Sequence, residues 1–130
     1  MHSFDTRAEE VAAVNAWLEN LAQAGVPHDD VMCLVRTSSL VAEITPLLPV
    51  RVMPMHEAKD AEYRAVAVLA LDQDIVPLEE RLMSANDEAR LDEIMNTERH
   101  LPYVVASRAR DHLWMSGVTP VSEFLGDLLR

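Results

Sequence analysis

The chain has 130 residues, of which 49% are hydrophobic, and its 22 acidic residues against 11 Lys and Arg give a formal net charge of −11 at pH 7. This length and apolar content predict one globular domain and exclude a disordered chain. Because release of counterions from nucleic acid needs a basic face, this acidity excludes strong DNA binding by the domain in isolation.

The opening segment predicts an amphipathic helix over residues 5–24. Thr6 and Glu9 have the spacing of a capping box, and an apolar stripe recurs every three to four residues behind them. Gly25 is suited to end the helix. Residues 26–30, VPHDD, predict a loop.

Two short strands and a second helix are predicted next. Residues 31–36 form a continuous apolar run, which is typical of a strand covered on both faces in a parallel sheet. The run contains Cys33, the only cysteine, for which we expect a buried thiol in a cytoplasmic protein. A helix over 37–48 and a strand over 50–53 follow, and the polar residues 55–63 predict a loop.

The second half repeats the alternation of strand and helix. Residues 65–71 form the most apolar stretch and predict a central strand. A turn at 73–77 and acidic helical sequence lead to a helix from Asn86 that Pro102 should bend or break, because proline lacks the amide donor. A strand over 112–116 and a helix from Thr119 through Leu129 complete the chain.

This alternation predicts an α/β fold, with a largely parallel sheet flanked by helices, in a single domain over 1–130. With three glycines and no GxxxxGK[ST] motif, the chain has no phosphate-binding loop of its own. No cysteine–histidine cluster has the spacing of a metal site. No apolar run reaches the roughly 18 residues that span a bilayer, and no signal peptide opens the sequence, so we expect no membrane association.

Two segments carry a family resemblance. PMHEAKDAEYRAVAVLAL (54–71) resembles motif V of superfamily 1 helicases of the UvrD/Rep type, and ERHLPYVVASRARDHLWMSG (98–117) resembles their motif VI. VMCLVRTSSL (31–40) is similar to the strand that precedes them in this family. The resemblance implies a RecA-like second motor domain of an ATP-driven DNA helicase or translocase, lacking the inserted helical subdomain of larger relatives. The phosphate loop and the Mg²⁺ ligands would then belong to an N-terminal motor domain.

The resemblance also implies roles for individual residues. Arg108, in the Ser-Arg-Ala of motif VI, would contact the γ-phosphate of ATP and stabilise its transition state. Glu62 would accept a hydrogen bond from a ribose hydroxyl, and Lys59 would lie at the nucleotide cleft. The alternatives are a surface ion pair of Arg108 with Glu98 or Asp111, and a solvated carboxylate at Glu62.

A second set of residues would face DNA, which can be single-stranded or duplex. His56 matches the histidine of motif V, and Arg36 with Thr37 follows a strand end, where a backbone phosphate can be contacted. An ordinary helix cap is the alternative for Thr37.

Departures from the family pattern leave other functions open. Pro54 stands where the family usually has threonine, and Asp60 replaces a glycine beside the nucleotide. Both changes weaken anion binding, so a helicase-derived binding or regulatory module without ATP turnover is the second interpretation. An independent small α/β enzyme has little support, because no acid–base or nucleophile set is visible.

Overall fold

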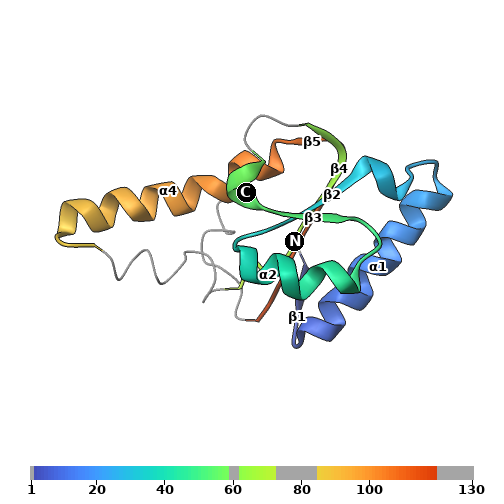
Figure 1. The fold of residues 1–130 in the computed structure, drawn as a ribbon, viewed down its shortest axis with the longest axis horizontal. Coiled ribbons are helices and arrows are strands. Elements are labelled where there is room, and N and C mark those ends of the chain that lie inside the picture. Colours follow the sequence, from blue (N-terminus) through green and yellow to red (C-terminus); the bar gives the residue numbers. More distant parts are fainter. Residues whose placement is uncertain (1, 59–61, 73–84, 120–130) are drawn as a thin grey trace.

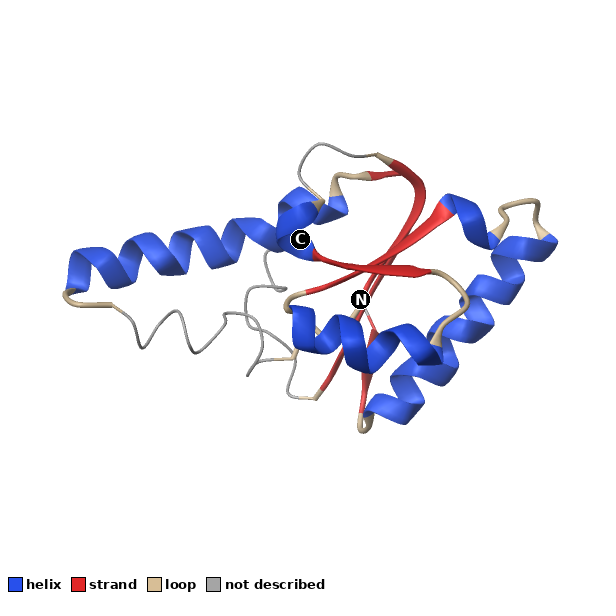
Figure 2. Ribbon diagram, viewed as in Figure 1, coloured by secondary structure: helices blue, strands red, loops and turns tan. Residues whose placement is uncertain are grey.

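The computed structural model describes residues 2–58, 62–72 and 85–119, without the side chains of residues 99, 100, 102 and 103. Five parallel strands form one sheet in the order β1-β5-β4-β2-β3 (Figures 1 and 2). The strands are β1 His2–Phe4, β2 Val31–Val35, β3 Arg51–Pro54, β4 Tyr63–Val68 and β5 Ala109–Val118. The helices are α1 Arg7–Gln23, α2 Ser38–Ile44 and α4 Glu88–Ala106, with 3-10 turns at His28–Asp30, Thr45–Leu47 and Met55–Glu57. The predicted α/β fold with a parallel sheet is confirmed.

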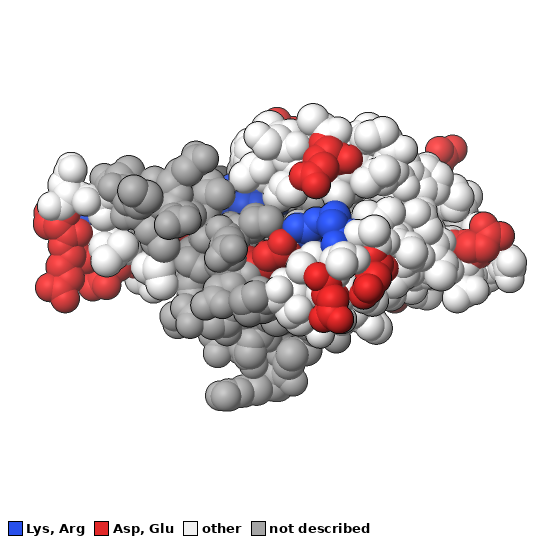
Figure 3. Space-filling model, turned by 90° about the horizontal axis from the view of Figure 1, so that it is seen from below, with Lys and Arg blue, Asp and Glu red and all other residues white. Residues whose placement is uncertain are grey.

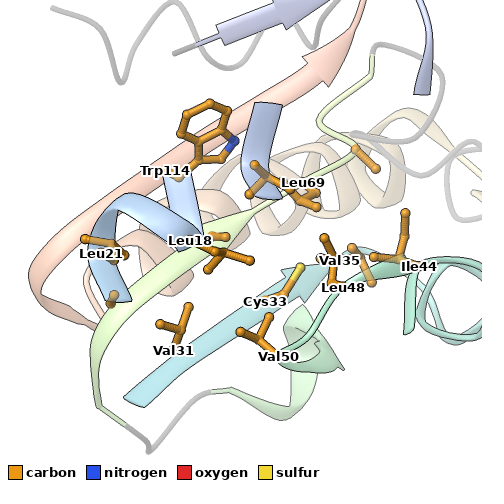
Figure 4. Close-up of a cluster of buried hydrophobic side chains, with 14 of the residues drawn as sticks. Leu18, Leu21, Val31, Cys33, Val35, Ile44, Leu48, Val50, Leu69 and Trp114 are labelled. Atoms are coloured by element: carbon orange, nitrogen blue, oxygen red, sulfur yellow. The ribbon is translucent and has the colours of Figure 1, made fainter. Parts of the chain in front are cut away.

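Both faces of the central strands are buried, which explains their uninterrupted apolar sequence. On β2, Val31, Cys33 and Val35 point toward α1 and α2, where they pack with Leu18 and Ile44 (Figure 4). The alternate side chains of β2 and β4 point to the opposite face, which α4 covers. They form the second cluster with Met32, Leu34, Met55, Ala58, Val66, Val68, Leu71 and Val105. The period of two along a strand therefore feeds two separate cores.

The first two helices begin at the caps that the sequence predicts. Thr6 accepts a hydrogen bond from the Glu9 amide at 3.1 Å, and Gly25 follows the helix with a φ of 95°. The second helix is shorter than predicted, because it ends at Ile44 and a 3-10 turn over Thr45–Leu47 follows. Pro46 in that turn has no amide proton to continue the α-helical bonding.

The largest differences between predicted and observed strands are in β1, β4 and β5, whereas the ends of β2 and β3 differ from the prediction by at most one residue. β1 was not predicted, since three residues give no periodic signal; it pairs with β5, and His2 stacks on Trp114 at 4.1 Å between ring centroids. β4 ends at Val68 rather than at residue 71, because Ala70 takes a φ of 59° that leaves the strand region. β5 is longer than predicted, extending into the polar residues before His112.

The long helix α4 runs without a break through Pro102, so the predicted break is wrong. Residues on both sides of the proline, Glu98 and Val105, are fully buried against the sheet side of the helix. That packing holds the helical path where one amide hydrogen bond is missing. In Figure 1, α4 extends well beyond the edge of the sheet. The turn predicted at 73–77 and the terminal helix predicted from Thr119 fall on residues outside the described ranges, except for Thr119 itself.

Gly117 permits a close approach of two segments, and its replacement by alanine should destabilise the fold. A Cβ at this position would lie 2.8 Å from the carbonyl carbon and oxygen of Leu71. We expect Gly117→Ala to lower the free energy of unfolding by about 1–3 kcal/mol, the usual effect of overpacking. Urea denaturation would measure the loss.

A matched variant separates this clash from the effect of glycine replacement in general. In Gly25→Ala the new Cβ has no atom within 4 Å, and only the backbone is strained, because its φ is 95°. We expect this strain to lower the free energy of unfolding by about 1–2 kcal/mol. If Gly117→Ala unfolds at the same urea concentration as the original protein, the close approach at Leu71 is not rigid.

Candidate nucleotide site and nucleic-acid edge

The structure brings Arg108 and Glu62 to adjacent positions at the amino ends of β5 and β4. Tyr63 pairs with Ala109 across these strands, and the amide of Tyr63 donates to the carbonyl of Arg108 at 2.8 Å. Glu62 is exposed and Arg108 is half-buried. Lys59, the third residue predicted for the nucleotide, lies outside the described residues. A cation and a carboxylate acceptor therefore share one edge of the sheet.

Arg108 forms neither of the two ion pairs, with Glu98 or with Asp111, that were considered as alternatives. Asp111 forms an ion pair with Arg64 at 3.4 Å, and Glu98 pairs with Arg36. Within residues 2–58, 62–72 and 85–119, no carboxylate forms an ion pair with Arg108. Its Nε is buried and has no hydrogen-bond partner there. Its contact with a nucleotide therefore stays a prediction.

The three residues predicted to face DNA lie at the opposite edge, where the parallel strands β2 and β3 end. Val35 pairs with Pro54, so Arg36 and Thr37 come close to the turn that carries the exposed His56. Thr37 caps α2, accepting from the Leu40 amide at 3.2 Å. Arg36, however, is only 6% exposed and lies against Glu98 rather than at the surface. A contact with nucleic acid stays a prediction for this edge.

Comparison with known proteins gives a family match over most of the chain. The family model of the UvrD-like helicase C-terminal domain matches residues 2–119. The chain belongs to this family. A solved structure described as the C-terminal domain of a possible DNA helicase from Lactobacillus plantarum WCFS1 is similar to this UvrD-like domain, with a TM-score of 0.70 and 19% identity. The match covers 95% of this chain and 75% of that chain, and at this identity it shows the fold alone. The search of curated proteins gives no match.

This UvrD-like domain also contains a partly buried polar cluster that the sequence analysis missed, formed by Arg7, Glu10, Asp72 and Ser116 (the Glu10 cluster). Glu10 is fully buried and accepts hydrogen bonds from the Ser116 hydroxyl at 2.6 Å and from the Ala70 amide at 3.1 Å. The signal was present in the sequence, because Glu10 lies on the same helical face as the buried apolar residues of α1.

Arg7 connects Glu10 to Asp72, which lies in the segment after β4. It contacts Glu10 and donates from Nη2 to Asp72 at 2.5 Å, and Asp72 in turn accepts from the Val118 amide at 2.7 Å. Burial alone would lower the pKa of Arg7, but the hydrogen bonds to Asp72 and Glu10 outweigh it and raise that pKa. The cluster thus joins α1, the segment after β4, and β5.

In the described part of the UvrD-like domain, the thiol and the acidic and histidine side chains form neither a reactive thiolate nor a metal site. Burial and the charge of Glu10 raise the pKa of the free Cys33 thiol, which disfavours the reactive thiolate. Among the described residues, no three His, Cys, Asp or Glu side chains gather closely enough to hold a metal ion. None of the helices in the described chain has the length and apolar character needed to cross a membrane.

Two shallow hollows lie on either side of His28, near the amino ends of β2 and β3. Their volumes are about 400 and 390 Å³. The first is lined by the end of α1 and the second includes Thr45 and Arg51. The Nε2 of His28 is buried without a hydrogen-bond partner in the described residues. Both hollows lie near β2 and β3, whereas Arg108 and Glu62 precede β5 and β4.

Proposed function

We propose that this chain is the second motor domain of an ATP-driven DNA helicase or translocase. The observation that carries the proposal is the pairing of β4 with β5, which sets Glu62 beside an Arg108 that has no carboxylate partner in the described chain. Family membership supplies the context of a motor with two domains. The nucleotide would bind between this edge and an N-terminal motor domain.

Each group at this edge has a proposed task. Arg108 stabilises the negative charge that spreads over the γ-phosphoryl oxygens during transfer, because a fixed cation there needs no reorganisation. Glu62, which is exposed, accepts a hydrogen bond from a ribose hydroxyl, and Lys59 adds positive charge at the cleft. Mg²⁺ would be held by the N-terminal motor domain, which also carries the phosphate loop.

DNA, single-stranded or duplex, would bind the full-length protein at the opposite edge of the sheet. His56 is exposed there and Thr37 is partly accessible, so these two side chains are the proposed contacts. Closure of the two motor domains around ATP would then move this edge relative to the N-terminal domain. We place the protein in the cytoplasm, and we take this domain to be single and without the inserted helical subdomain.

Hydrolysis of ATP by the domain joined to an N-terminal motor domain tests the proposal. We expect turnover that single-stranded DNA stimulates, and no turnover by this chain by itself, because the chain has no phosphate loop. The isolated N-terminal domain serves as the control. If that domain hydrolyses ATP at the same rate with and without this chain, the proposed role in the nucleotide site is refuted.

A binding or regulatory module without ATP turnover is the second candidate. The net charge of −11 favours it, and in Figure 3 acidic side chains are spread widely while basic ones are confined to a small central area. Such a surface fits a basic protein partner better than DNA. The same assay separates the two functions, since this module would give no ATP hydrolysis in the two-domain protein.

A further inference from the structure

The ladder between β4 and β5 is irregular close to Arg108. The paired residues on either side of the irregularity are Tyr63 with Ala109, and Ala65 with His112. Two steps along β4 therefore match three steps along β5, so Arg110 and Asp111 together lie opposite Arg64. One extra residue on one strand of a pair is a β-bulge, which bends the strand and increases its twist.

The face of the sheet on which the side chains lie also changes at the bulge. Ala65 belongs to the cluster on the side of α1 and α2, whereas Tyr63 packs against the cluster on the side of α4. Residues two apart share a face in a regular strand, so the alternation of β4 is broken between these two residues. Ala109 lies with Tyr63 on the α4 side. The paired amino ends of β4 and β5 are therefore turned together relative to the rest of the sheet.

The turned ends of the two strands carry Glu62 and Arg108. The carbonyl of Arg108 accepts a hydrogen bond from the amide of Tyr63 at 2.8 Å. If the ladder kept the register of its central part, the Tyr63 amide would meet the carbonyl of Ala109 instead. Arg108 would then lie one residue, about 3.3 Å, further along from Glu62. The bulge therefore decides that Arg108, rather than Ala109, lies beside Glu62.

Arg64, the residue opposite the bulge, connects it to the loop between α1 and β2. Its Nε lies 3.4 Å from Asp111 Oδ2, and its Nη1 donates to the carbonyl of Gly25 at 3.2 Å and lies 3.7 Å from Asp30 Oδ2. The side chains of Arg64 and Asp111 are 37% and 53% exposed, and exposed ion pairs contribute little to stability. We therefore expect these contacts to affect the local geometry of the bulge rather than the stability of the fold.

We propose that the bulge at Arg110 and Asp111 directs Arg108 toward the γ-phosphate of ATP, with Arg64 as a positioning residue. This inference rests on the proposed function and concerns what orients its central side chain. Without the extra residue the same pairs could form, but the alternation of β5 would turn Arg108 to the opposite face of the sheet. That change is larger than the misplacement of about 1 Å that can lower a rate roughly 100-fold.

Deletion of Arg110 from the two-domain protein tests the inference. The shortened β5 can pair regularly with β4, and both Arg108 and Asp111 are kept. We expect kcat to fall roughly 100-fold or more. Arg110→Ala keeps the length of the strand, so it is the matched control and should leave kcat near normal. Insertion of an alanine after Asp111 in the deletion variant restores the length and should restore most of the lost kcat.

The same deletion in an Arg108→Ala background distinguishes orientation of this side chain from general damage. The deletion should lower kcat no further there, because the side chain that the bulge orients is absent. An equal loss in both backgrounds, an unchanged kcat after the deletion alone, or no recovery with the added alanine overturns the inference. Normal kcat in Arg108→Ala itself would refute the proposed function instead, so the two failures are distinguished.

A measurement on this chain needs neither ATP nor a deletion. The amide proton of Tyr63 should exchange slowly with solvent, because it is bonded to the carbonyl of Arg108. We expect Arg64→Ala to accelerate this exchange roughly tenfold, since local opening of the bulge becomes easier. Arg90→Ala, which removes an exposed ion pair with Glu93 on α4, should leave the exchange unchanged. Equal exchange rates in the two variants would overturn the assignment of Arg64 as a positioning residue.

Discussion

Arg108→Ala in the two-domain protein should lower the rate of DNA-stimulated ATP hydrolysis by about 10³-fold or more, the usual effect of removing such an arginine. The reason is that Arg108 lies at the amino end of β5 without a carboxylate partner in the described chain, and in the proposed function it contacts phosphate oxygens. The loss should appear in kcat more than in the KM for ATP, because the charge it meets develops in the transition state. Steady-state ATPase kinetics would measure both constants.

Arg110→Ala is the matched control for this prediction. Arg110 lies two residues further along, is exposed, and has the same side chain. It should retain near-normal kcat, and both variants should unfold at temperatures close to that of the original protein. Comparable losses in the two variants would mean that the edge acts only through its overall charge, which contradicts a specific role for Arg108.

Glu10→Ala should be the most destabilising substitution of those considered, lowering the free energy of unfolding by about 3–5 kcal/mol. The change leaves the Ser116 hydroxyl and the Ala70 amide without their buried acceptor, and it removes one of the two carboxylates that surround Arg7. Buried donors without partners cannot recover hydration in the folded state. Urea unfolding followed by fluorescence of the two tryptophans would give the value.

Glu9→Ala provides the comparison, because Glu9 is the exposed neighbour on the same helix. Its effect should stay within about 1 kcal/mol, because the change removes only the exposed hydrogen bond that Glu9 accepts from the Asp5 amide at 3.4 Å. Labelling of Cys33, the only thiol and a fully buried one, offers a second measurement, since labelling should accelerate only where unfolding does. If Glu10→Ala unfolds like Glu9→Ala, the Glu10 cluster contributes no net stability.

The layered fold could be predicted because its signals are local. Continuous apolar runs at 31–36 and 65–71 correspond to β2 and β4, and Thr6 caps α1 as its spacing indicates. Element ends were less accurate where distant groups decide them. Ala70 leaves the strand conformation where its amide donates to Glu10, which is 60 residues away in sequence. No local pattern contains that contact.

The candidate site was likewise predictable only where its signals are local in sequence. The motif containing Arg108 could be recognised from its neighbours in sequence, and strand pairing then placed Glu62 beside it. The burial of Arg36 could not be anticipated, because an arginine after a strand gives the same local pattern whether it faces solvent or a carboxylate. Its partner Glu98 lies 62 residues away on α4. Only the packing of that helix on the sheet reveals the pair.

The short strand β1 has a practical consequence for any engineered version of the protein. His2, Ser3 and Phe4 pair with Ser116, Gly117 and Val118, so residues 2–4 border the strand that begins just after Arg108. A purification tag or fluorescent protein fused directly before His2 would crowd this ladder. A spacer of several glycines and serines would leave the ladder intact.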